Sequence, residues 1–202
     1  TWAISVGDPV DNFRLLDHTG ASHELYYHSN AKAVAFLVQG NGCPIVRNAM
    51  PRFKELRDQY AAQGVEFFML NTNLQDTRAN ILKEVEKFDY DIPILKDDTQ
   101  IIGESLNLVR TGEVFVVDPT TWTVSYQGAI DDRLTYENQK KEAKHHFLAD
   151  ALDNMIAGND VAVASTNGIG CLINFPEQQA MAKAKHVEIS YSEDIAPILL
   201  EN

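Results

Sequence analysis

The sequence predicts an α/β sandwich with a mixed central sheet, an N-terminal hairpin and a C-terminal extension. Two apolar runs of strand length, residues 33–38 and 65–70, flank a segment whose apolar residues have helical spacing. Segments with hairpin patterns stand before and after this unit. Strands joined through a helix run parallel whereas hairpin strands run antiparallel, so the sheet is expected to contain both arrangements.

The first elements are a hairpin, a buried strand and a long helix. Residues 12–17 and 22–27 flank a short turn at His18, Thr19 and Gly20, which is typical of a hairpin. Residues 33–38 are continuously apolar, as expected of a central strand covered on both faces. The following helix is expected to end at Gly64, and its apolar residues are Met50, Phe53, Leu56, Tyr60 and Ala61.

The second half continues with alternating elements. Asp76 or Thr77 is suited to cap a helix that runs to about Phe88, with Ile81, Leu82 and Val85 on one face. The expected elements after it are a strand over 92–95, a short helix over 100–106, a hairpin over 113–118 and 123–127, and a last helix over 140–157.

The apolar periodicity ends near Gly158, which divides the chain. Residues 1–158 are expected to form the folded domain, and residues 159–190 are expected to be a tail that wraps the domain or links it to another. Residues 191–202 form a third segment.

Composition excludes several classes of protein. A net charge of -12 without a block of basic residues argues against binding to nucleic acid or to an anionic membrane surface. No apolar run approaches the roughly 20 residues that a membrane span needs. Two cysteines are too few for a disulfide-rich scaffold or a cysteine-based zinc cluster.

Cys43 is the first candidate for a reactive group. It lies between the buried strand 33–38 and the start of the long helix, and Pro44 suits the first helical turn. The positive end of a helix dipole favours a thiolate, which is the reactive form of cysteine. We therefore expect a partly exposed Cys43 at a helix N-terminus.

The pattern around Cys43 resembles the thioredoxin superfamily, and in particular the redoxin (AhpC/TSA-type) domains of extracytoplasmic proteins, over about residues 6–175. The matching features are Cys43 as the nucleophilic first cysteine, Pro51 as the proline that kinks the helix, residues 64–67, strand 113–118 and the segment 128–133. The resemblance implies a thioredoxin-like fold, redox chemistry at Cys43 and a periplasmic or secreted location.

The chain departs from these families at several positions. The second cysteine of a CxxC motif falls at Val46, and the cis-proline of the substrate-facing loop falls at Gly112, after Thr111. The threonine and proline that peroxiredoxins place ahead of their reactive cysteine fall at Gly40 and Phe36. The resemblance still implies that Thr111 lies beside Cys43, and we include it among the candidate catalytic residues.

Cys171 is the second candidate. It is the only other cysteine, and Gly168 and Gly170 would let its backbone approach another element closely. One interpretation is that the tail folds back and Cys171 resolves an oxidised Cys43. The other is that both cysteines are small buried hydrophobic residues.

The function is therefore predicted to be thiol-disulfide or related redox chemistry at Cys43, with protein thiols, disulfides or small oxidants as partners. The alternative is a non-catalytic thioredoxin-fold module that binds metal or docks an electron-transfer domain. His145 and His146 together with Cys43 would make a soft metal site suited to copper, although adjacent helix residues face different ways. Asp131, Asp132 and Arg133 suit either a cation cluster or, more often, a charged turn.

The last segment, residues 191–202, resembles the stretch that precedes the CxxCH haem-attachment motif of c-type cytochromes. This resemblance implies that a cytochrome c domain with haem c follows Asn202, and that this chain itself holds no cofactor. The alternative for this segment is a short amphipathic helix capped by Ser192.

Overall fold

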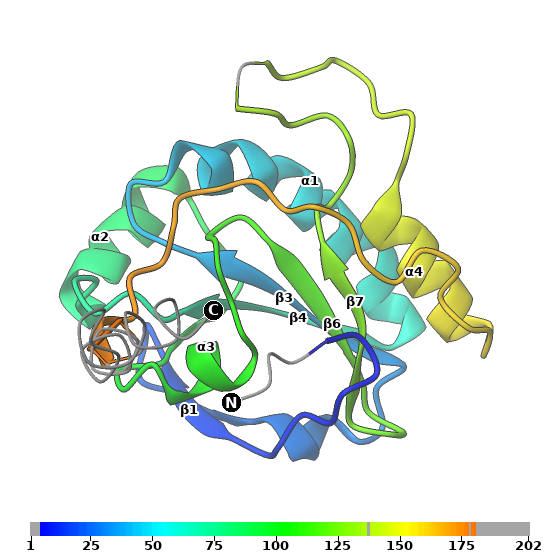
Figure 1. The fold of residues 1–202 in the computed structure, drawn as a ribbon, viewed down its shortest axis with the longest axis horizontal. Helices are drawn as coiled ribbons and strands as arrows, with labels where there is room; N and C mark the ends of the chain where they lie inside the picture. The colour runs from blue at the N-terminus through cyan, green and yellow to red at the C-terminus, as the bar shows by residue number, and fades with distance from the viewer. Residues whose placement is uncertain (1–4, 137, 178, 181–202) are drawn as a thin grey trace, which may run out of the picture.

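The central sheet has seven strands in the order β2-β1-β5-β4-β3-β6-β7 (Figure 1). The computed structural model describes residues 5–136, 138–177 and 179–180. Strands β3, β4 and β5 run parallel, while the pairs β1–β2, β1–β5, β3–β6 and β6–β7 are antiparallel. The predicted mixed sheet and N-terminal hairpin are confirmed. The strands are β1 (Arg14–Asp17), β2 (Ser22–Glu24), β3 (Ala33–Gln39), β4 (Val65–Asn71), β5 (Ile94–Lys96), β6 (Val114–Asp118) and β7 (Thr123–Gly128).

Helices follow the strands where the sequence pattern predicts them. The N-cap of α2 is Thr77, whose hydroxyl accepts the N–H of Asn80, and Gly64 has a φ of 90° after the turn that ends α1. Pro51 lies inside α1, as the resemblance implies. The helices are η1 (Leu25–His28), α1 (Pro44–Tyr60), η2 (Ala61–Gln63), α2 (Arg78–Phe88), α3 (Ile101–Ser105) and α4 (Phe147–Ile156).

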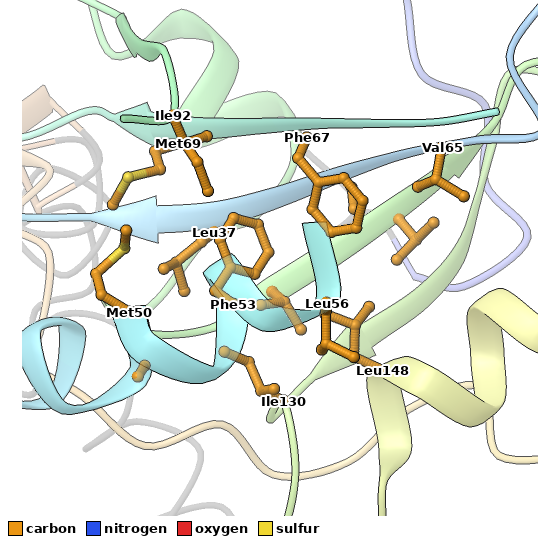
Figure 2. Close-up of a cluster of buried hydrophobic side chains, with 14 of the residues drawn as sticks. Leu37, Met50, Phe53, Leu56, Val65, Phe67, Met69, Ile92, Ile130 and Leu148 are labelled. Atoms are coloured by element: carbon orange, nitrogen blue, oxygen red, sulfur yellow. The ribbon is translucent and has the colours of Figure 1, made fainter. Parts of the chain in front are cut away.

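Two apolar cores lie on the two faces of the sheet. Alternate residues of β3 point to opposite faces, so Leu37 belongs to the first core and Phe36 to the second. Helices α1 and α4 cover the first core, where Met50, Phe53 and Leu56 of α1 meet the strands (Figure 2). The second core is covered by α3, by the N-terminal segment and by the C-terminal residues Ile173 and Phe175.

The last helix begins later than the pattern predicts. Residues 140–146 are not helical because their backbone groups pair with the turn before them. The Asp132 carboxylate accepts the N–H groups of Lys144 at 2.8 Å and His145 at 3.1 Å, and the N–H of Lys140 donates to Arg133 O at 2.9 Å. The helix therefore starts only at Phe147, so the prediction of a helix over 140–157 is wrong at its beginning.

Two smaller predictions are also wrong. Strand β2 ends at Glu24 rather than at residue 27, because Leu25 turns inward to the second core and starts η1. Ala61 is exposed rather than inward, because it belongs to η2 and not to the buried face of α1.

The segment after α4 folds back across the domain. Figure 1 shows it as the orange trace that leaves α4 and crosses the molecule toward α2 and α3. Ser165 forms a bridge with Gln127 of β7, and Leu172 forms a bridge with Arg110. These contacts hold the described part of the tail against the domain, while the division of the chain into a domain, a tail and a third segment stays a prediction. None of the helices in the described ranges is both long and apolar enough to cross a membrane, and residues 191–202 lie outside these ranges.

Candidate active site

Cys43 lies where the buried strand β3 passes into α1. It is the N-cap residue of α1, and Pro44 follows at the first helical position. The loop between strand and helix is held by two carboxylates. Asp76 accepts the N–H of Asn41 at 2.9 Å, and Glu84 accepts the N–H of Gly42 at 2.9 Å. The predicted position at a helix start is confirmed.

A buried network of polar side chains holds this loop in place. One carboxylate oxygen of Asp76 accepts from the side-chain amides of Asn71 at 2.8 Å and Asn73 at 3.1 Å. Asn71 also donates to the side chain of Gln39, which in turn donates to the side chain of Asn41 at 2.9 Å. Sequence reasoning considered Asp76 only as a helix cap. Its role here shows only in three dimensions, because its partners come from β4, from the segment that follows β4 and from the loop before α1.

Thr111 approaches Cys43 from the loop that precedes β6. Its hydroxyl donates to Cys43 Sγ at 3.1 Å, so the predicted proximity is confirmed. The N–H of Gly112 donates to Val38 O at 2.7 Å, which fixes the loop against β3. Gly112 has a φ of 90°, and a Cβ there would lie 2.8 Å from Ile45 Cγ2, so this position requires glycine. The described residues contain no cis peptide bond.

Residues 168–173, which we call the strap, cover this loop. Their backbone pairs with the segment before β6 at two points, because the N–H of Thr111 donates to Cys171 O at 2.9 Å and the N–H of Ile173 donates to Val109 O at 3.0 Å. A Cβ at Gly170 would lie 1.4 Å from Thr111 O, so only glycine permits this approach. Gly168 and Gly170 thus allow the backbone of the strap to lie directly against Glu113 and Thr111.

The strap places the two thiols in contact. Cys171 Sγ lies 3.0 Å from Cys43 Sγ, and both cysteines are free. The predicted approach of Cys171 to Cys43 is confirmed, whereas the roles of both thiols in a reaction stay predictions. A disulfide of about 2.05 Å needs a further approach of only about 1 Å.

The expected exposure of Cys43 is wrong. Only 4% of Cys43 is exposed, because its thiol lies under Thr111 and the strap and packs in the first core. Cys171, in contrast, is exposed. The two cysteines therefore differ in their exposure to solvent.

The two thiols also differ in acidity. Burial alone would raise the pKa of the Cys43 thiol. Hydrogen bonds from the Cys171 thiol and the Thr111 hydroxyl, with smaller contributions from the Val46 and Cys171 N–H groups, outweigh burial and lower that pKa. Burial and the neighbouring Cys43 sulfur raise the pKa of Cys171. The arrangement favours a Cys43 thiolate that accepts a hydrogen bond from a neutral Cys171.

A clamp that the sequence did not reveal holds the strap from outside. The hydroxyl of Tyr136 lies 3.0 Å from both the N–H and the carbonyl oxygen of Gly170. Arg110 Nη1 donates to that hydroxyl at 3.0 Å and to Gly170 O at 3.2 Å. Tyr136 lies in an irregular segment without periodicity, so no sequence signal identifies it.

The other candidate residues do not join this site. Within the described ranges, no group of three or more histidine, cysteine or acidic side chains is placed to hold a metal. His145 stacks on Phe147, with ring centroids 5.7 Å apart, and His146 is the N-cap of α4. Asp131 pairs with Arg133 at 2.8 Å, so this triplet is a charged turn.

Comparison with known proteins identifies the family. The sequence model of the AhpC/TSA family matches residues 6–133. No curated protein matches the chain. The crystal structure of the hypothetical protein SMc02350 from Sinorhizobium meliloti 1021 is 26% identical, with a TM-score of 0.74 over 85% of this chain and 94% of that chain.

Two further structures share the fold at lower identity. Peroxidoxin BcpB from Mycobacterium tuberculosis is 18% identical, with a TM-score of 0.58 over 76% of this chain and 97% of that chain. A putative thiol:disulfide interchange protein DsbE from Chlorobium tepidum is 15% identical, with a TM-score of 0.58 over 76% of this chain and 99% of that chain. These similarities confirm a thioredoxin-like fold.

Proposed function

Because the chain belongs to the AhpC/TSA family, we propose that it is a thiol-dependent oxidoreductase in which Cys43 and Cys171 alternate between dithiol and disulfide. The observation that carries this proposal is the 3.0 Å contact between the two sulfurs. A pair of thiols in contact, with opposite shifts of their pKa, is suited to reversible oxidation.

The reaction balances with a disulfide as the oxidant. The Cys43 thiolate, the Cys171 thiol and a partner disulfide give the Cys43–Cys171 disulfide, one partner thiolate and one partner thiol. Two electrons pass from the protein sulfurs to the partner sulfurs, and the Cys171 proton passes to one of the products. In the reverse direction the partner thiols are oxidised. Thr111 is the third member of the site, because its hydroxyl stabilises the Cys43 thiolate.

Disulfides suit this site better than peroxides as partners. The fold is shared with a protein titled a peroxidoxin and with one titled a putative thiol:disulfide interchange protein, so the fold is compatible with either chemistry. Gly40 and Phe36 stand where peroxiredoxins have threonine and proline, and Cys43 is buried. We therefore propose protein or small-molecule thiols and disulfides as partners, with small oxidants as the second class.

The location and the attached domain are part of the same proposal. An extracytoplasmic redoxin, periplasmic or secreted, would work where disulfides persist. A c-type cytochrome domain beyond Asn202, carrying haem c, would give the thiol pair an electron-transfer neighbour. Both statements rest on sequence resemblance alone.

Oxidation of the purified chain tests the proposal. We expect treatment with a disulfide oxidant to remove both free thiols and to give one peptide pair that contains Cys43 and Cys171, which reduction restores. Cys171→Ser should prevent this pair, and the oxidant should then leave a mixed adduct on the chain. The non-catalytic alternative gains if both thiols stay free under conditions that oxidise ordinary dithiols.

A further inference from the structure

In the proposed dithiol couple, either Cys43 or Cys171 could form the covalent adduct with the partner, and their different exposure distinguishes them. The inference drawn here rests on the proposed function. Resemblance to thioredoxin-like proteins assigns external attack to the cysteine at the helix start, which is Cys43. In this chain, however, only 4% of Cys43 is exposed, whereas Cys171 is exposed. A partner that approaches from solvent therefore meets Cys171 before Cys43.

The cover over Cys43 is held at several points. The strap is hydrogen-bonded through its backbone on both sides of Leu172. Ile173, its last residue, and Phe175, which follows it, are buried in the second core. On the other side of Cys171, the Tyr136 hydroxyl and Arg110 bind Gly170. Direct access of a partner to Cys43 therefore requires several of these contacts to open together.

The chemistry of exchange also favours Cys171. In thiol-disulfide exchange, the sulfur that is attacked must be accessible, and the sulfur that leaves does so faster when its thiol is more acidic. In the disulfide form of this pair, attack at Cys171 releases Cys43. Its thiolate is then stabilised by the Thr111 hydroxyl, 3.1 Å away. The same hydroxyl also favours a Cys171 thiolate, but burial and the neighbouring Cys43 sulfur outweigh it and raise the pKa of Cys171.

We propose that Cys171 is the sulfur that forms the covalent adduct with the partner, and that Cys43 is the internal thiolate that never leaves the core. In the oxidised protein, a partner thiolate attacks Cys171 Sγ. The Cys171–Cys43 bond breaks, and its electron pair goes to Cys43. The Cys43 thiolate takes the proton of a second partner thiol, and the resulting thiolate attacks the partner's sulfur in the adduct. This attack forms the partner disulfide and releases Cys171 as a thiolate, which takes the proton back from Cys43.

The reverse reaction uses the contact between the thiols. The Cys43 thiolate takes the proton of Cys171 as Cys171 attacks the partner disulfide and expels one partner thiolate. That thiolate takes the proton from Cys43. The regenerated Cys43 thiolate attacks Cys171 Sγ and expels the second partner sulfur as a thiolate. The net change is the oxidation of the Cys43–Cys171 dithiol by one partner disulfide, which leaves one partner thiolate and one partner thiol.

Mapping of the adduct tests this assignment directly. The oxidised wild-type chain is treated with limiting 2-mercaptoethanol, quenched in acid and digested. We expect the mercaptoethanol adduct on the Cys171 peptide at about tenfold or greater excess over the Cys43 peptide. An adduct mainly on Cys43, or equal amounts on both, overturns the proposal.

Single-cysteine variants provide a second test with the reduced protein. With 5,5′-dithiobis(2-nitrobenzoate) as the disulfide, Cys43→Ser should react at the rate of an exposed thiol. Cys171→Ser should react about 100-fold more slowly, because Cys43 reacts only when the strap opens. Equal rates, or a faster reaction of Cys171→Ser, overturn the assignment. In denaturant both variants should react alike, which controls for intrinsic thiol reactivity.

The two proposals fail in different ways. If oxidation yields no Cys43–Cys171 disulfide in the wild type, the proposed dithiol function fails. If the disulfide forms but the adduct maps to Cys43, the dithiol function stands and only the assignment of Cys171 is wrong.

Discussion

The two segments that meet at the thiol pair are built in opposite ways. Cys43 ends a regular unit, because β3 and α1 position it and the first core surrounds it. Cys171 lies on an irregular strap held by backbone hydrogen bonds and by the Tyr136 hydroxyl, and its side chain is exposed. Acidity and accessibility, which a single reactive thiol must combine, are divided here between two residues.

The largest expected effect comes from lifting the strap. In Gly170→Ala the new Cβ would lie 1.4 Å from Thr111 O, so the strap cannot keep its place. We expect intramolecular disulfide formation to slow by about 100-fold, the factor that corresponds to local opening, and alkylation of Cys43 to speed up. Free-thiol titration and peptide mapping measure both.

Gly158→Ala is the matched control for this variant. Gly158 also has a positive φ, of 74°, but a Cβ there meets nothing within 4 Å. Gly158→Ala should form the Cys43–Cys171 disulfide at the wild-type rate. If Gly170→Ala also forms the disulfide at the wild-type rate, the close approach of the strap is not what joins the two thiols.

A smaller effect is expected from the hydroxyl that stabilises Cys43. Thr111→Val removes a hydrogen bond that lowers the pKa of the Cys43 thiol, so this pKa should rise. The Cys43 thiolate then forms only at a higher pH, and intramolecular exchange should slow by about fivefold, which is the effect expected from the loss of one hydrogen bond. The ultraviolet absorbance of the thiolate, followed against pH, reports the pKa. Thr111→Ser keeps the hydroxyl and should behave like the wild type, while an unchanged pKa in Thr111→Val would remove Thr111 from the site.

The smallest effect is expected from the clamp. Tyr136→Phe removes the hydroxyl that bonds Gly170, but the backbone pairing of the strap and its buried end remain. Alkylation of Cys43 should therefore rise only by about threefold. Tyr27→Phe removes the hydroxyl of another exposed tyrosine, beside β2 at the far edge of the sheet, and should change nothing. Equal alkylation in the two variants would show that Arg110 and the backbone suffice.

The regular unit that carries Cys43 was predictable from the sequence, whereas the strap that carries Cys171 was less so. Apolar runs and helical spacing indicated β3, α1 and β4, because buried strands and amphipathic helices leave a local pattern. The start of α4 was missed because the Asp132 carboxylate takes up backbone groups from residues 144 and 145, which is a contact between segments rather than a local propensity.

The sequence indicated which residues meet at the candidate site better than it indicated how they are buried and held. Cys43 follows from its place between strand and helix, Thr111 from resemblance, and Cys171 from the cysteine count and its flanking glycines. The burial of Cys43 was not predictable, because the strap that covers it comes from more than 120 positions away in the chain. Tyr136 and the carboxylate of Asp76 act through backbone groups of distant segments, which leaves no pattern in the sequence.

The separation of Cys43 and Cys171 along the chain also connects the redox state to folding. Their positions differ by 128 residues, so a disulfide between them would close most of the domain into one loop. In the chain-entropy account, such a loop restricts the unfolded chain enough to stabilise the fold by about 5 kcal/mol at 25 °C. By thermodynamic linkage, the folded protein favours its own disulfide over the dithiol by the same amount relative to the unfolded chain. Folding of the domain therefore lowers the reduction potential of the Cys43–Cys171 pair and makes its disulfide a weaker oxidant.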